Sequence, residues 1–277
     1  MSNPLTLGFS PCPNDTFMFY PLVHGLVDTG GLSYRERLED VETLNQLALQ
    51  GELDVTKVSY AALGHIRDEY ALLRSGSALG RGCGPLLVAR EVMDPRDLAG
   101  RTIAVPGRYT TALLLLRLYD PALTNFVVMP FSEIMDTVLN GDADAGVIIH
   151  ESRFTYQGFG LHKLLDLGEW WEGDTGLPIP LGGIVARRSL GSATIAAIER
   201  ALAGGVAYAR SHPDEAARYI CEHAQEMSPD VCAAHIGLYV NDFSVDLGDE
   251  GERAIHCLLE RAERAGIIPV SRTPLFM

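Results

Sequence analysis

A seven-residue pattern that occurs twice limits the folds open to this chain. LQGELDV (49–55) and LNGDADA (139–145) lie 90 residues apart in the sequence. In each copy a helical stretch ends at a glycine, an acidic turn follows, and an apolar strand begins. Because one supersecondary unit recurs, we expect two α/β lobes of similar topology.

Strand and helix patterns alternate through the first two thirds of the chain. Short apolar runs predict buried strands, and the segments between them carry apolar residues at helical spacing. Repeated strand–helix–strand units predict an α/β fold with largely parallel sheets, and the chain becomes mainly helical after about residue 189. The predicted strands are 5–10, 32–40, 53–60, 85–90, 101–106, 126–131 and 145–150, and the predicted helices are 16–25, 41–50, 61–70, 110–119 and 132–140.

A second pair of similar segments indicates where the chain passes between the lobes. GPLLVAR (84–90) and GGIVAR (182–187) are both apolar strands that end in Val-Ala-Arg. We expect them to be the two crossover strands of a hinge, the first leaving the N-terminal lobe and the second returning to it. This predicts a discontinuous lobe, 1–89 plus 188–277, and a continuous lobe, 90–187, with a ligand cleft between them.

The charge balance restricts the possible partners. The formal net charge is −14, which argues against a nucleic acid because phosphates need a basic face. It argues equally against binding to an anionic membrane surface. A small anionic ligand remains compatible, provided that Lys, Arg or N–H donors gather locally. The sequence makes no prediction of the oligomeric state.

Targeting signals and cysteine usage together predict a cytoplasmic protein. The N-terminal stretch has neither the basic start nor the apolar core of a secretory signal, and no apolar run approaches the roughly 18 residues of a membrane span. The five cysteines are scattered and form no C-x-x-C pair, which argues against disulfides and a cysteine-rich zinc site.

Two predicted strand ends carry candidate site residues. Ligands of parallel α/β sheets bind at the carboxyl ends of the strands. The repeat places Lys57, Val58 and Ser59 at one such end and His150 at the equivalent end of the other lobe. His150 is either a general base or a hydrogen-bonded histidine that ends a strand. Lys57 either points into the cleft or lies along the sheet with its ammonium group in solvent.

Two predicted helix starts offer further candidates. The loop before Thr111 and Ala112 opens a helix whose N–H groups suit a carboxylate or phosphate, although a threonine-capped helix with nothing bound is commoner. Asp15 either caps the first helix or binds a hydroxyl group of a ligand. Cys12 is a weak candidate nucleophile because no base is assigned to it. The glycine-rich segment 76–84 is interpreted as a turn in preference to an anion-binding loop.

The remaining histidines show no metal-binding spacing, and the sequence contains neither a P-loop nor a dinucleotide-binding motif. The pattern therefore predicts no metal site and no cofactor. The histidines interpreted as structural are His65, His212, His223, His235 and His256.

Several segments spread over nearly the whole chain resemble a single family. The most specific are SPCPNDTF (10–17) and IIHESRFTY (148–156). With them the chain resembles the 1,4-dihydroxy-6-naphthoate synthase family of the futalosine-dependent menaquinone pathway. The other similar segments are LEDVETLN (38–45), TKVSYAA (56–62), ALGRGCGPLLVAR (78–90), AVPGRYTTA (104–112) and the final TPLFM (273–277).

This resemblance implies a fold like that of the type II periplasmic binding proteins. It implies a lyase that converts cyclic dehypoxanthine futalosine to 1,4-dihydroxy-6-naphthoate and releases a three-carbon fragment, expected to be dihydroxyacetone. The implied chemistry requires no metal and no redox cofactor. His150 matches the family's catalytic base. The positions implied to contact or lie near the substrate are Lys57, Val58, Ser59, Thr111, Ala112, Asp15 and Asn45.

Two alternative functions remain open from the sequence. The first is a cytosolic solute-binding module with the same two-lobed fold, in which His150 only contacts the ligand. The second is chorismate dehydratase, a sibling enzyme of the same pathway with a similar fold. The SPCPNDTF and IIHESRFTY segments favour the naphthoate synthase over this sibling.

Overall fold

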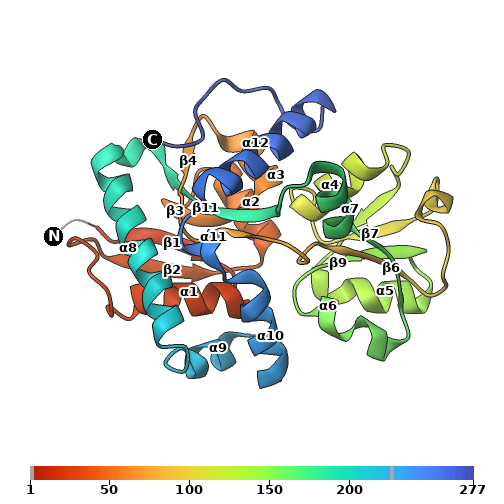
Figure 1. Ribbon diagram of the computed structural model, residues 1–277, viewed down its shortest axis with the longest axis horizontal. Helices are drawn as coiled ribbons and strands as arrows, with labels where there is room; N and C mark the ends of the chain where they lie inside the picture. Colours follow the sequence, from red (N-terminus) through yellow and green to blue (C-terminus); the bar gives the residue numbers. More distant parts are fainter. Residues whose placement is uncertain (1–2, 225–227) are drawn as a thin grey trace.

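The computed structural model describes residues 3–224 and 228–277, and its strands form two separate sheets (Figure 1). The strands of the first sheet are β1 (Leu5–Phe9), β2 (Tyr34–Leu38), β3 (Val55–Ser59), β4 (Tyr70–Leu72), β5 (Ala78–Gly80) and β11 (Ile179–Arg187). Those of the second sheet are β6 (Leu86–Ala89), β7 (Ile103–Val105), β8 (Phe126–Val128), β9 (Ala145–Ile148) and β10 (His162–Asp166).

Helices cover both sheets, so each sheet with its helices forms one lobe (Figure 1). The helices of the first lobe are α1 (Pro13–Val23), α2 (Val41–Leu49), α3 (Tyr60–Ile66), α8 (Ser192–Ser211), α9 (Ala217–His223), α10 (Pro229–Tyr239), α11 (Asp242–Val245) and α12 (Gly248–Arg264). Those of the second lobe are α4 (Thr111–Tyr119), α5 (Ile134–Asn140), α6 (Ser152–Thr155) and α7 (Leu167–Thr175). The prediction of two α/β lobes is confirmed.

Each sheet combines a parallel part with antiparallel additions. In the order β2-β1-β3-β11-β4 the first three strands are parallel, and β11 runs antiparallel to β3, β4 and β5. In the order β10-β6-β9-β7-β8 the last three are parallel, and β6 is antiparallel to both of its neighbours. The prediction of largely parallel sheets therefore holds for the strand–helix–strand units alone. At β6 and β11 the chain enters a sheet from the other lobe, and these two strands run antiparallel to β9 and β3, respectively.

The chain crosses between the lobes twice, and both crossings lie before the strands predicted to make them. It leaves the first sheet after β5 and joins the second at β6, which pairs with β9 and β10. It returns after α7 and joins the first sheet at β11. The predicted division into 1–89 plus 188–277 and 90–187 therefore lies one strand too late at each crossing, because sheet pairing assigns β6 to the second lobe and β11 to the first.

The repeated pattern forms the same unit in both lobes. Helix α2 is followed by Gly51 and then β3, and helix α5 is followed by Gly141 and then β9. The two glycines adopt φ values of +68° and +87°, a left-handed conformation in which a side chain is unfavourable. Both strands are fully buried. The unit therefore brings the carboxyl ends of β3 and β9, with Ser59 and His150, to corresponding places in the two lobes.

The C-terminal helices return to the first lobe, as predicted. Helices α8, α9 and α10 pack on α1, while α12 contacts β11 and α3 and also reaches α4 of the second lobe (Figure 1). This packing places α10 against α1. Helix α10 also reaches the cleft. Within residues 3–224 and 228–277 no helix combines the length and apolarity needed to cross a membrane.

Candidate active site

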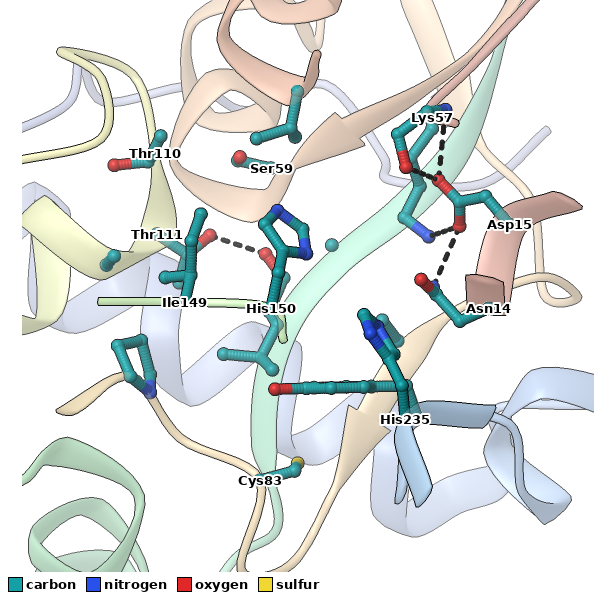
Figure 2. Close-up of a pocket in the computed structure, with 18 residues that line it drawn as sticks. Asn14, Asp15, Lys57, Ser59, Cys83, Thr110, Thr111, Ile149, His150 and His235 are labelled. Carbon is teal, nitrogen blue, oxygen red and sulfur yellow. Dashed lines mark hydrogen bonds and ion pairs between the residues drawn. The ribbon is translucent and has the colours of Figure 1, made fainter. Parts of the chain in front are cut away.

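A cavity lies between the lobes at the carboxyl ends of β3 and β9. Its empty volume, including the open mouth, is about 660 Å³, which is the size of a small-molecule site. Figure 2 shows His150 near its centre, with Ser59 and Thr111 to one side and the Lys57–Asp15–Asn14 group to the other. The lining residues are Ser10, Asn14, Asp15, Val41, Lys57, Ser59, Ala78, Cys83, Pro85, Thr110, Thr111, Ala112, Ile149, His150, Leu181, Gly182, His235 and Tyr239.

His150 stands in an unusual backbone conformation just after β9. Its φ of +56° makes it the single non-glycine residue with positive φ among the described residues. Such a conformation costs on the order of 1–3 kcal/mol and is typical of functional sites. The imidazole packs against the ring of Phe131, with 5.0 Å between centroids, and Nδ1 lies 3.6 Å from Sγ of Cys12.

The surroundings of His150 favour its neutral form. Burial lowers its pKa below the ordinary value, and the nearby Glu151 and Asp15 carboxylates oppose this shift without cancelling it. An imidazole that is unprotonated at neutral pH can accept a proton. The location therefore suits the predicted base.

Lys57 reaches the cavity and is paired there with Asp15. Nζ of Lys57 lies 2.6 Å from Oδ1 of Asp15, and the two residues are only 5% and 1% exposed. The other carboxylate oxygen of Asp15 accepts hydrogen bonds from the hydroxyl and the N–H of Ser10, at 2.7 and 3.2 Å. Asn14 donates to Oδ1 of Asp15 at 2.9 Å. These contacts compensate the burial of both charges.

Asp15 does not cap the first helix, so this one of the two roles predicted from the sequence is wrong. Cys12 is the N-cap residue of α1, Pro13 begins the helix, and Asp15 lies in the first turn with its carboxylate directed to Lys57. The N-terminal turn therefore supplies a partner for a buried lysine, and Asp15 lines the cavity beside it.

The strand β3 presents Lys57 and Ser59 to the cavity but not Val58. Successive side chains of a strand point to opposite faces, and Val58 is fully buried in the hydrophobic core. Asn45 is also fully buried and lies behind Ser59, where its Oδ1 accepts the N–H of Ser59 at 2.8 Å and its Nδ2 donates to the hydroxyl at 3.1 Å. Neither Val58 nor Asn45 lines the cavity; Asn45 orients Ser59.

Three residues at the start of α4, Thr110, Thr111 and Ala112, line the cavity. Thr110 is the N-cap residue and its hydroxyl accepts the N–H of Leu113 at 3.3 Å. The hydroxyl of Thr111 donates to the carbonyl of Leu181 at 2.6 Å and accepts the N–H of Ala61 at 3.3 Å. Thr111 thus ties the second lobe to the first, and Ala112 follows it along the cavity wall.

His235 is a cavity residue that the sequence reading missed. It comes from α10 and is 1% exposed, and its ring stacks at 6.1 Å from that of His150 (Figure 2). Its Nδ1 lies 3.7 Å from a carboxylate oxygen of Glu151, yet within the described part of the chain it has no hydrogen-bond partner. Burial lowers its pKa well below the ordinary value. Only the packing of the C-terminal helices brings it to the site, so no local motif indicates it.

The glycine-rich segment 76–84 is not a simple turn, because it contains strand β5, which pairs with β11. Arg81 bonds to Glu250 and to the carbonyl of Gly176, and so it is directed away from the cavity. Cys83 lines the cavity, but burial raises the pKa of its thiol to about 12, which keeps it protonated.

Three potential metal-ligating atoms also meet beside the cavity. One atom each of Cys12, His150 and Glu151 lie within 4.8 Å of one another. Taken together, the cavity offers a neutral imidazole, a paired lysine, a serine hydroxyl and a helix N-terminus, a set able to remove a proton and stabilise negative charge on an oxygen.

Comparison with curated proteins gives two close relatives. The chain is 53% identical to the 1,4-dihydroxy-6-naphthoate synthase of Thermus thermophilus over 99% of both chains. It is 51% identical to the enzyme of the same name from Streptomyces coelicolor over 96% of this chain and 95% of that one.

Solved structures show the same fold. Protein AF1704 from Archaeoglobus fulgidus matches with a TM-score of 0.89 and 38% identity over 96% of this chain and 98% of that one. The Candida albicans CA3427 gene product, described as having the generic periplasmic binding protein fold, matches with a TM-score of 0.67 and 18% identity, covering 98% and 92% of the two chains. The predicted periplasmic-binding-protein-like fold is confirmed.

The sequence profile described as menaquinone biosynthesis matches residues 5–264. Since this match spans most of the chain and both curated relatives bear the same enzyme name, the chain belongs to the menaquinone biosynthesis family, within the group of the 1,4-dihydroxy-6-naphthoate synthases.

Proposed function

We propose that this protein is a lyase that converts cyclic dehypoxanthine futalosine to 1,4-dihydroxy-6-naphthoate, with release of a three-carbon fragment that we expect to be dihydroxyacetone. The observation that carries the proposal is the place of His150. Its neutral imidazole stands in the cavity opposite Lys57 and Ser59, while the start of α4 forms another wall.

His150 acts as the general base through Nε2. Its Nδ1 faces the thiol of Cys12 at 3.6 Å. When the ring proton is on Nδ1 and directed to this sulfur, Nε2 is unprotonated and available to the substrate. Cys12 is thus a positioning residue, and burial supports this role because it raises the pKa of the thiol and keeps the sulfur from acting as a nucleophile.

The bond cleavage follows the pattern of a retro-aldol reaction. The base removes a hydroxyl proton, a carbonyl forms on the departing three-carbon fragment, and the carbon–carbon bond breaks. Its electron pair passes into the ring ketone, whose oxygen gains negative charge as the ring becomes aromatic. Lys57 and Ser59 are placed to stabilise this oxygen, and a base of this kind contributes about 10²–10⁴-fold to the rate.

Two features favour catalysis over simple ligand binding. A solute-binding module needs no residue in a strained conformation, yet His150 is held at positive φ by its surroundings. Burial also lowers its pKa, which prepares it for proton transfer. We place the reaction in the cytoplasm, where the buried thiols of Cys12 and Cys83 stay reduced.

A turnover assay tests the proposal. Purified protein is incubated with cyclic dehypoxanthine futalosine, and both products are followed by mass spectrometry, with chorismate offered in a parallel reaction. We expect many turnovers per protein to dihydroxynaphthoate and no consumption of chorismate. Stoichiometric binding without turnover would support the binding-module alternative, and loss of chorismate would support the dehydratase; either result overturns the proposal.

A further inference from the structure

We propose that Cys12, His150 and Glu151 bind a zinc ion, with His235 as the fourth ligand, and that this ion inhibits the enzyme. The first observation is the meeting of three donor atoms of different kinds beside the cavity. A thiol, an imidazole and a carboxylate oxygen lie within 4.8 Å of one another. This mixture of sulfur, nitrogen and oxygen donors is typical of Zn²⁺ sites in proteins.

The spacing of two of these atoms fits a tetrahedral ion. Zinc is bound at about 2.3 Å by sulfur and about 2.0–2.1 Å by nitrogen, so a tetrahedral angle separates the two donors by about 3.5–3.6 Å. Sγ of Cys12 lies 3.6 Å from Nδ1 of His150. The two side chains therefore need little movement to share one ion.

The second observation is the unsatisfied nitrogen of His235. This residue is 1% exposed, and its Nδ1 makes no hydrogen bond to any described residue. A buried polar atom without a partner normally costs about 1–3 kcal/mol. Nδ1 lies 3.7 Å from Oε1 of Glu151, which is one of the three donor residues. An ion ligated by Glu151 would give this nitrogen a partner.

A separate cavity borders the donors. It has an empty volume of about 380 Å³ and is lined by Cys12, Glu151 and His150 together with Pro11, Asp40, Val41 and Phe131. His150 and Val41 are shared with the larger cavity, which is lined by neither Cys12 nor Glu151. The donors therefore border a space of their own beside the larger cavity, and Asp40 adds a further acidic residue to its lining.

Binding of the ion would block the base without filling the substrate cavity. An imidazole that binds a metal through Nδ1 carries its proton on Nε2. Nε2 is the nitrogen assigned to proton removal, so the metal-bound enzyme loses its base. This inhibitory consequence rests on the proposed function, whereas the binding of zinc does not.

A direct zinc titration tests the binding. Protein freed of metal with a chelator is titrated with Zn²⁺ in competition with a chromophoric chelator, and Co²⁺ is added separately as a spectroscopic probe. We expect one ion per chain and a cobalt spectrum with a thiolate-to-metal band. Failure to bind either ion at micromolar concentration overturns the proposal.

Matched variants identify the ligands. Removing a group that merely supports a ligand lowers metal affinity about 10–100-fold, so we expect Cys12→Ser to lower it by at least this factor and to abolish the thiolate band. His235→Gln removes the proposed fourth ligand, so we expect it to weaken zinc binding as well. Cys221→Ser changes an exposed cysteine on α9 and should leave zinc binding and turnover unaltered. Equal affinity in all three variants contradicts the site.

Turnover tests the inhibition separately. We expect kcat to fall in proportion to the fraction of zinc-bound protein while KM stays constant, with full recovery on adding chelator. Zinc binding with undiminished turnover contradicts the inhibitory role. If the protein does not turn over the proposed substrate, the zinc titration and the variants still decide whether the zinc site exists. Failure of the proposed function is therefore distinguishable from failure of the zinc proposal.

Discussion

At the scale of single residues, His150 combines a strained backbone with a pKa lowered by burial. The location of His150 could be predicted because it lies in the family-specific segment 148–156 and in the predicted strand that follows the second copy of the internal repeat. The side chains beside it were less predictable. Val58 lies between two cavity residues yet faces the core, because strand residues alternate between faces. His235 is 85 positions away in sequence, and only the packing of α10 brings it to His150.

The lowered pKa of His150 predicts the pH dependence of catalysis. The base must be unprotonated, so kcat/KM should be at its plateau at neutral pH and fall as the pH decreases through the pKa of the free enzyme. Because burial places this pKa below the ordinary value of about 6.5, the acid limb should have its midpoint below 6.5. The measurement is kcat/KM from pH 4.5 to 8, with circular dichroism at each pH to exclude unfolding. A midpoint above 6.5 contradicts this assignment.

The buried pair of Lys57 and Asp15 predicts a large loss of stability in Asp15→Asn. This change leaves the lysine buried without its carboxylate, which costs about 3–5 kcal/mol. The free energy of unfolding is measured in urea. Adding Lys57→Met to the first change should restore much of the stability but not the activity.

The control for this pair lies on the surface. Glu222→Gln breaks the exposed ion pair with Arg218, and we expect little change in unfolding because solvent screens such pairs. If Asp15→Asn destabilises the protein no more than Glu222→Gln does, the buried pair contributes no more to stability than an exposed one.

At the scale of elements, local patterns predict most helices and strands up to residue 150, and they predict none of α6, β10 and α7. One wrong boundary comes from long-range pairing. The segment 61–70 has a helical pattern, yet α3 ends at Ile66 and Tyr70–Leu72 forms β4. The reason is β11, which returns from the second lobe and pairs with this strand. The displaced lobe boundaries have a similar cause, since the sequences of β6 and β11 do not reveal which sheet each strand joins.

The contact between the first crossing and α7 predicts that Gly84→Ala is harmful. A Cβ on Gly84 would lie 2.1 Å from the backbone nitrogen of Gly168, in the first turn of α7. The backbone must shift, which typically costs about 1–3 kcal/mol. Thermal and urea unfolding of the variant measure this loss.

A second glycine of the same region serves as the matched control. A Cβ on Gly173, within α7, meets no atom within 4 Å, so Gly173→Ala should be neutral or stabilising by up to about 1 kcal/mol. Similar losses in the two variants would show that the close approach at Gly84 is not the cause.

At the scale of the whole molecule, side chains from one lobe bond to the backbone of the other around the cavity. Glu42 of α2 is buried and accepts the N–H of Arg108 at 2.9 Å and that of Tyr109 at 3.1 Å, both from the second lobe. Thr111 contributes the reciprocal bond to Leu181 of the first lobe. The sequence predicts the two lobes and the cleft, but not these contacts, because each joins residues more than 60 positions apart.

The bonds of Glu42 join the two lobes, so we expect Glu42→Ala to let the lobes move apart. A hydrogen bond to a charged group is worth about 1.5–3 kcal/mol, so KM should rise about 10–100-fold and the radius of gyration in small-angle X-ray scattering should increase. Glu91→Ala, at an exposed position of the second lobe, should change neither quantity. An unaltered KM in Glu42→Ala contradicts a role of these bonds in holding the lobes around the substrate.

If His150 removes a proton from a substrate held between the lobes, replacing it should slow the reaction without preventing substrate binding. Turnover of cyclic dehypoxanthine futalosine is measured for the wild type and for His150→Asn, with substrate affinity determined by calorimetry in the same preparations. We expect kcat to fall by about 10²–10⁴-fold while the substrate still binds. Turnover of His150→Asn within a few-fold of the wild type would contradict this role of His150.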